Sequence, residues 1–71
     1  MVKLVVRRHF EPREFRFETL REAVDDALGQ LEFDAAYPNY IEVDGVRVWE
    51  SPGPGKVSES LRHLVGISEE L

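Results

Sequence analysis

The chain has 71 residues, no cysteine and a formal net charge of −5. A chain of this length folds as one domain, residues 1–71, whose core contributes only about 3–5 kcal/mol of net stability, so a homodimer is compatible with its size. The lack of cysteine excludes disulfides, thiolate nucleophiles and cysteine-ligated metals. No apolar run approaches the roughly 20 residues of a membrane span. We therefore expect a soluble, cytoplasmic protein that does not bind membranes.

Positive and negative charges are unevenly distributed along the chain. Residues 1–21 contain six basic and three acidic residues, a net charge of +3. Residues 22–71 contain three basic and eleven acidic residues, a net charge of −8. Such separation gives the molecule an electric dipole that can steer a charged partner.

The first 18 residues show the period-two pattern of a β-hairpin. Val2, Leu4, Val6 and Phe10 alternate with Lys3, Arg7 and His9, which predicts a strand with a buried even face; Val5 and Arg8 are exceptions to the pattern. Pro12 cannot donate a backbone hydrogen bond, so we expect the chain to turn through residues 11–13. A second strand follows at residues 14–18. On this pattern Phe10, Phe15 and Phe17 point into the core.

An amphipathic helix is predicted from Leu20 to about Glu32. Thr19 and Glu22 fit a capping box, in which the Thr19 hydroxyl accepts from the Glu22 amide and the Glu22 carboxylate accepts from the Thr19 amide. Gly29 is a weak point, because glycine costs about 1 kcal/mol relative to alanine inside a helix. The apolar side chains recur at helical spacing and form one stripe: Leu20, Ala23, Val24, Ala27, Leu28 and Leu31.

The strongest fold signal is the stretch from Tyr37 to Glu50, in which two alternating runs meet at Asp44-Gly45. This dipeptide suits a type I′ turn, which needs positive φ at both central residues. The turn pairs Val43 with Val46, Glu42 with Arg47, Ile41 with Val48, and Tyr40 with Trp49. One face then carries Ile41, Val43, Val46 and Val48, which we expect under the helix. The other carries Tyr40, Glu42, Arg47 and Trp49.

A short C-terminal helix is predicted after the proline- and glycine-rich segment 51–56. Ser58 is its expected N-cap, Leu61 and Leu64 lie on its apolar face, and Gly66 ends it, leaving residues 66–71 as a flexible tail. A helix this short must pack on something: we expect it to pack on its own sheet, and the alternative is a partner, on which it would become ordered as an interaction tail. The fold class is therefore α+β, ββαββ(α), with a four-stranded, mainly antiparallel sheet and one amphipathic helix on one face.

The residues that carry catalysis are scarce. His9 and His63 are far apart in sequence, both are expected on the surface, and neither has an obvious group to orient it. No nucleophile–base pair is apparent, and the carboxylates fit a solvated face better than a metal site. We therefore expect a protein that is not an enzyme and that uses no cofactor or metal.

Binding to another protein is the favoured function, through the face that carries Tyr40, Glu42, Arg47 and Trp49. Exposed aromatic side chains beside an arginine are typical of interface centres. The alternative for this face is that the C-terminal helix covers Tyr40 and Trp49, which would make them core residues.

Nucleic-acid binding is the second candidate function, through the basic outer face of the first hairpin: Lys3, Arg7, His9 and Arg16. The inward parity of the phenylalanines and the negative total charge count against it. A third candidate is an acidic surface that imitates nucleic acid, built from the carboxylates after Arg21.

The segment between residues 15 and 50 contains the pattern Phe15-x-Phe17-x-Thr19-Leu20-x-x-Ala23, followed by Ile-Glu-Val-Asp-Gly-Val-Arg-Val-Trp at residues 41–49. This half of the chain resembles small accessory proteins encoded by actinobacterial phages. The resemblance carries no catalytic motif. It implies a protein that binds and modulates a host protein, such as a defence complex or a regulator.

Overall fold

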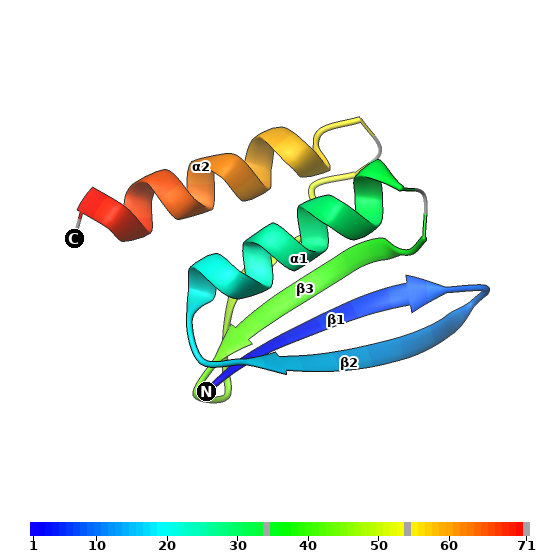
Figure 1. The fold of residues 1–71 in the computed structure, drawn as a ribbon, viewed down its shortest axis with the longest axis horizontal. Coiled ribbons are helices and arrows are strands. Elements are labelled where there is room, and N and C mark those ends of the chain that lie inside the picture. The colour runs from blue at the N-terminus through cyan, green and yellow to red at the C-terminus, as the bar shows by residue number, and fades with distance from the viewer. Residues whose placement is uncertain (34, 54, 71) are drawn as a thin grey trace.

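Within the residues that the structure describes, four strands and two helices follow one another (Figure 1). The computed structural model describes residues 1–33, 35–53 and 55–70, without the side chains of residues 67–70. The elements are β1 (Val2–Arg8), β2 (Glu11–Phe17), α1 (Leu20–Glu32), β3 (Tyr37–Val43), β4 (Val46–Glu50) and α2 (Val57–Glu70). The predicted α+β class and the ββαββ(α) order are confirmed.

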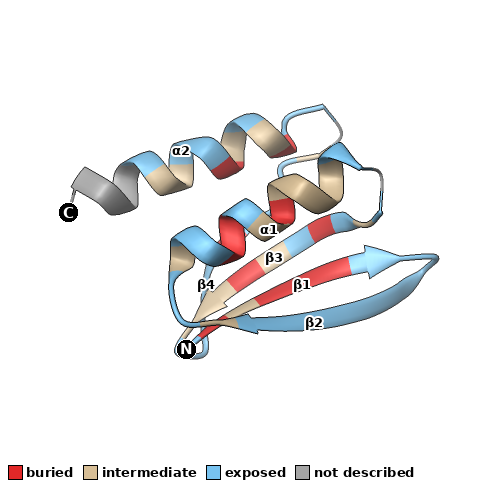
Figure 2. Ribbon diagram, viewed as in Figure 1, coloured by how far each residue is buried: buried red, intermediate tan, exposed pale blue. Residues whose placement is uncertain are grey.

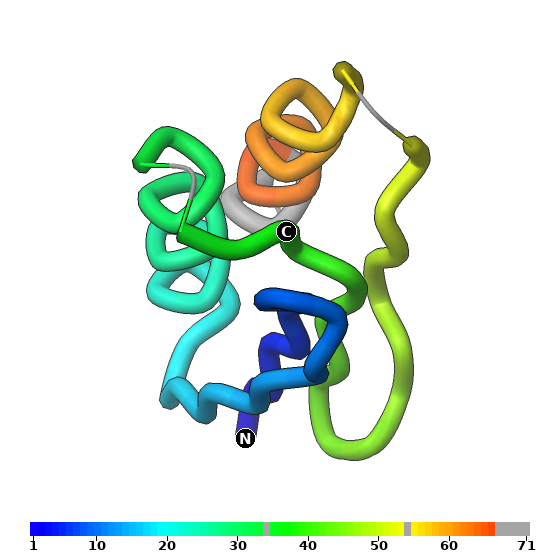
Figure 3. Tube along the Cα trace, turned by 90° about the vertical axis from the view of Figure 1, so that its right-hand side faces the viewer, coloured from blue at the N-terminus to red at the C-terminus, as the bar shows by residue number. Residues whose placement is uncertain are grey.

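The strands form a single antiparallel sheet in the order β2-β1-β3-β4. Helix α1 packs across β1, β2 and β3, and α2 packs beside α1, so both helices lie on one side of the sheet (Figure 3). No helix among the described residues covers the opposite side, which we call the open face. Neither helix is long and apolar enough to cross a membrane, within the part of the chain that the structure describes.

The turn of the first hairpin lies at His9 and Phe10, so its prediction at residues 11–13 is wrong. Both residues have positive φ, 52° and 68°, as a two-residue type I′ turn requires. Pro12 lies inside β2, opposite Arg7. Proline is tolerated there because β2 is an edge strand, where a missing backbone donor faces solvent.

Helix α1 begins and ends where the sequence predicts. The Thr19 hydroxyl accepts from the Glu22 amide at 3.2 Å. The same hydroxyl donates to the Glu22 carboxylate at 2.9 Å, where the sequence predicted a bond from the Thr19 amide. Gly29 lies within the helix, and Phe33 caps its end by donating its backbone N–H to the carbonyl of Gly29 at 3.1 Å.

The second hairpin turns at Asp44 and Gly45, which have φ values of 49° and 83°, as predicted. Next to the turn, Val43 pairs with Val46 and Glu42 with Arg47. The register then shifts, because β4 contains one extra residue between Arg47 and Trp49, the signature of a β-bulge. The predicted pairs Ile41–Val48 and Tyr40–Trp49 are therefore wrong: Ile41 pairs with Trp49, and Tyr40 with Glu50.

The bulge changes which residues of the hairpin reach the core. Ile41 is fully buried and Val43 is partly buried against the core, as predicted. Val46 and Val48 are exposed, 64% and 41%, so their predicted place under the helix is wrong. Trp49 takes a core position and is only 7% exposed.

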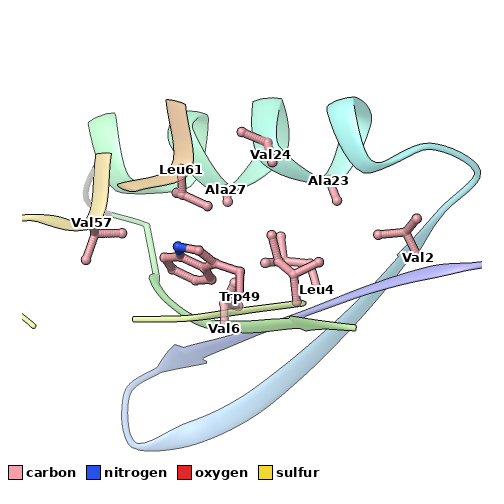
Figure 4. Packing of buried hydrophobic residues seen from close by; sticks show 10 residues of the cluster. Val2, Leu4, Val6, Ala23, Val24, Ala27, Trp49, Val57 and Leu61 are labelled. Carbon is pink, nitrogen blue, oxygen red and sulfur yellow. The ribbon is translucent and has the colours of Figure 1, made fainter. Parts of the chain in front are cut away.

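The core lies between the sheet and the two helices (Figure 2). Figure 4 shows Trp49 among residues of β1, α1 and α2, with Val57 and Leu61 of α2 above it. The Trp49 Nε1–H donates to the Ser60 hydroxyl at 2.8 Å, so the indole nitrogen remains hydrogen-bonded after burial.

The C-terminal helix is longer than predicted. It begins at Val57, one residue before the predicted N-cap Ser58, and runs through Gly66 to Glu70. Gly66, predicted to end the helix, therefore lies inside it. Of the predicted tail, residues 66–70 belong to α2, and Leu71 lies outside the described residues.

Candidate binding surfaces

The open face holds three of the four residues predicted to bind a protein partner. Tyr40 and Glu42 on β3 and Arg47 on β4 lie there, because β1 and β3 pair Lys3 with Glu42 and Val5 with Tyr40. Trp49 lies on the other side, under α2. The alternative interpretation of the sequence, in which the C-terminal helix covers both Tyr40 and Trp49, holds for Trp49 alone, because the bulge in β4 turns Trp49 away from the face that carries Tyr40. Tyr40 is only partly buried.

The charged groups of the open face largely satisfy one another. The Arg47 guanidinium lies 3.8 Å from the centre of the Tyr40 ring and 2.9 Å from the Glu50 carboxylate. The hydrogen bond to Glu50 is the main cause of the raised pKa of Arg47. The Lys3 ammonium lies 2.9 Å from Glu42, and donation to that carboxylate is the main cause of its raised pKa. A partner on this face would have to break ion pairs before it formed new ones.

The predicted basic stripe is divided by the structure into two separate parts. Lys3 also contacts Glu14 at 3.7 Å, and Arg16 contacts the same carboxylate at 3.3 Å, so both cations of this half have acidic neighbours. Arg7 and His9 lie at the far end of β1, at and beside the turn. The four residues therefore do not form one continuous cationic track.

The end of the molecule around the first turn combines arginines with exposed aromatic rings. We call it the hairpin-tip site and define it by Arg7, Arg8, His9, Phe10 and Tyr37. A surface cavity of about 350 Å³ opens there. Its lining comes from β1, the first turn, the end of α1 and the start of β3: Arg7, Arg8, His9, Leu31, Ala35, Ala36 and Tyr37.

Phe10 is the most exposed large apolar side chain of this site. It is 93% exposed and stands at the turn, next to the cavity residue His9. Phe33, at the end of α1, is 80% exposed and lies two residues before Ala35 of the cavity wall. Figure 1 shows the first turn and the end of α1 at the same end of the molecule. Two large apolar side chains are thus exposed to solvent at the end of the molecule that holds the cavity.

The backbone at Phe10 is also unfavourable. An L-residue with a large side chain is an outlier at positive φ, and such conformations cost of order 1–3 kcal/mol each. The second hairpin meets the same requirement with Asp44 and Gly45, which accept it readily. The first turn therefore carries a conformational cost that a different pair of residues would avoid.

Neither guanidinium of Arg7 and Arg8 has a hydrogen-bond or ion-pair partner among the described residues. Arg13, on the neighbouring strand, contacts Glu11 at 3.5 Å. The cavity walls contributed by Leu31 and Ala36 are apolar. The site therefore offers two positive charges on opposite sides of the sheet, and Arg8 is the one on the helix side with the apolar wall of Leu31 and Ala36.

Sequence reasoning missed Arg8 and Phe10 as site residues, because the alternation of the first strand was extended through the true turn. No turn signal marks these positions in the sequence, because His9 and Phe10 are not typical turn residues. The pairing of Val2–Arg8 with Glu11–Phe17, which leaves two residues for the turn, is seen only in the structure.

A second cavity, of about 320 Å³, lies beside α2 and is lined by Pro52, Lys56, Glu59, Ser60 and His63. His63 is exposed, as predicted, and the lining mixes both charges without an oriented nucleophile. No cluster of histidine, cysteine or carboxylate side chains among the described residues is arranged to hold a metal ion.

No protein-family model, curated protein or solved structure matches this chain.

Proposed function

We propose that the protein is a small, non-enzymatic protein-binding module and that the hairpin-tip site is its contact surface. The observation that carries the proposal is Phe10: a phenylalanine 93% exposed at a turn whose backbone disfavours it. Strained conformations persist where they serve a function, and exposed aromatic side chains anchor interfaces. This moves the contact surface away from the sheet face that the sequence favoured, because Trp49 belongs to the core.

The charges of the site define the partner. Arg7 and Arg8 would be matched by carboxylates, and the apolar cavity wall and the Phe10 ring by an apolar side chain. The partner is therefore a protein segment in which acidic residues flank an apolar one. The resemblance of residues 15–50 to phage accessory proteins would make this partner a bacterial host protein.

Nucleic acid is the alternative ligand, since arginines beside an exposed aromatic ring also suit a single strand. The chain's net charge of −5 and the acidic neighbours of Lys3 and Arg16 leave few cations for phosphates. Binding to a random oligonucleotide that weakens steeply with added salt would support this alternative and reject the first.

The test is quantitative affinity capture from cells of the source organism or its host, with three immobilised baits. The wild type is compared with Phe10→Gly, which removes the ring, and with Val46→Ser. Val46 is a matched control, because it is an exposed apolar residue near the turn of the second hairpin.

A partner retained by the wild type and by Val46→Ser, but lost from Phe10→Gly, supports the proposal. The same partner retained equally by all three baits overturns it. A Tyr40→Ala bait that loses the partner while Phe10→Gly keeps it would return the contact surface to the open face.

A further inference from the structure

Strand β2 is an edge of the sheet and is unusually accessible. Each of its seven residues is exposed except Phe17, which is partly buried (Figure 2). The other edge, β4, has five residues and carries the bulge, two features that discourage pairing with another chain. Of the two edges, β2 is therefore the one suited to adding a strand.

The position of the turn determines which backbone N–H and C=O groups of β2 are not bonded to β1. The pair Arg8–Glu11 closes a two-residue turn and exchanges hydrogen bonds, and antiparallel pairs alternate between bonded and non-bonded. Glu14 and Arg16 are therefore non-bonded positions toward β1, so their N–H and C=O groups point away from the sheet. Pro12 is also a non-bonded position toward β1, so its missing N–H does not weaken the β1–β2 pairing, and a pair of β2 strands centred on Phe15 uses residues 13–17 and does not need that donor.

These groups and the side chains beside them are self-complementary. In an antiparallel pair of two β2 strands centred on Phe15, Glu14 lies opposite Arg16 of the second copy, and Arg16 opposite its Glu14. Both pairs are bonded positions of the new ladder, and opposite charges facing each other across strands are stabilising. The sequence of β2 is thus self-complementary in backbone and in charge, and the exposed contacts that Glu14 makes with Arg16 and Lys3 of its own chain would be exchanged for the contacts between copies.

Phe15 supports the same arrangement from the other side of the sheet. It pairs with Leu4 on the helix-covered side, yet it is 41% exposed because α1 does not cover the edge strand fully. At the centre of the antiparallel pair, the two Phe15 side chains would lie directly opposite each other, in the closely spaced non-bonded position. Aromatic cross-strand pairs are among the stabilising ones.

We propose that two copies of this chain associate through β2 to form a continuous eight-stranded sheet with a two-fold axis at Phe15. The inference is independent of the proposed function. Because the two β2 strands run in opposite directions, the two hairpin-tip sites lie at opposite ends of the dimer, which would let it engage two partners.

Charge exchange at the central pairs tests the proposal. Glu14→Arg places arginine opposite arginine in a homodimer, and Arg16→Glu places glutamate opposite glutamate. Each single variant should dissociate at least about tenfold more readily than the wild type. A 1:1 mixture of the two should form a heterodimer, because the two arginines of the Glu14→Arg copy then face the two glutamates of the Arg16→Glu copy. The variant that carries both substitutions should also recover self-association.

The measurement is sedimentation equilibrium from micromolar to millimolar concentration, with circular dichroism to show that each variant is folded. Glu50→Arg is the control, because it makes the same charge change on the other edge strand and also removes a contact with an arginine. It should leave the association unchanged. A wild type that stays monomeric throughout, or a dimer that Glu14→Arg does not weaken, would overturn the proposal.

Discussion

Replacing His9-Phe10 by Asn-Gly should stabilise the protein. Both positions have positive φ, which glycine adopts freely and asparagine tolerates, whereas phenylalanine does not. Phe10 is 93% exposed, so its ring contributes little to the core that the substitution could remove. The exchange should therefore relieve backbone strain at almost no cost in packing.

The expected gain follows from two opposing terms. Left-handed backbone costs an L-residue about 1–2 kcal/mol, and histidine tolerates it better than phenylalanine does. Glycine loses about 0.5–1 kcal/mol through the greater freedom of the unfolded chain. The net gain is about 1 kcal/mol, which raises the Tm of a domain of this size by about 4–8 °C.

Thermal and urea unfolding, followed by fluorescence of the buried Trp49, would measure this gain. Phe10→Gly alone should also stabilise, because it removes the strain at position 10. Phe10→Ala is its matched control: it removes the same ring but keeps a Cβ at positive φ, so it should not stabilise. If Phe10→Ala stabilises as much as Phe10→Gly, the backbone is not strained. If Phe10→Gly destabilises, the ring packs on the fold, and the reasoning about the turn is wrong.

Three further predictions concern the core, α1 and the open face. Trp49→Ala should destabilise by about 3–5 kcal/mol and Ser60→Ala by about 1 kcal/mol, measured by urea unfolding; near-wild-type stability of Trp49→Ala would contradict the burial of this side chain. Gly29→Ala should stabilise by about 1 kcal/mol, because an added Cβ meets no atom within 4 Å; a loss of stability would indicate an unseen contact. The pKa of Lys3 is raised above 10.5, so its contribution to stability is complete below that value and is lost as pH rises through the folded-state pKa. The Tm advantage of the wild type over Lys3→Met should therefore shrink as pH rises through that pKa, and an advantage that grew with pH would refute the pairing with Glu42.

The existence and order of the elements could be predicted because each has its own periodicity. Period-two runs on either side of a capped amphipathic stripe predict two hairpins and a helix, and α1 has the predicted bounds. The Asp44-Gly45 turn was also predictable, because aspartate tolerates and glycine readily adopts the positive φ that this turn requires.

The errors arise where a single residue shifts the phase of a strand. The extra residue in β4 moves the Trp49 side chain to the other side of the sheet. A bulge has no periodic sequence pattern, so this change could not be predicted. At the first turn, Phe10 contradicts the rule that large apolar residues are buried, and Pro12 is tolerated because β2 is an edge strand. The open face depends on the β4 bulge and the hairpin-tip site on the His9-Phe10 turn, and the sequence alone misplaced both surfaces because it shows neither feature.

Site-specific photocrosslinking tests the central claim, that the hairpin-tip site contacts a partner protein, most directly. The photoreactive analogue p-benzoylphenylalanine replaces Phe10 in one sample and Val46 in another, and living cells that contain the partner are irradiated. We predict a covalent adduct with a second protein from position 10 and none from position 46. An adduct formed only from position 46, or none from position 10 while the wild type still captures its partner, would contradict the claim.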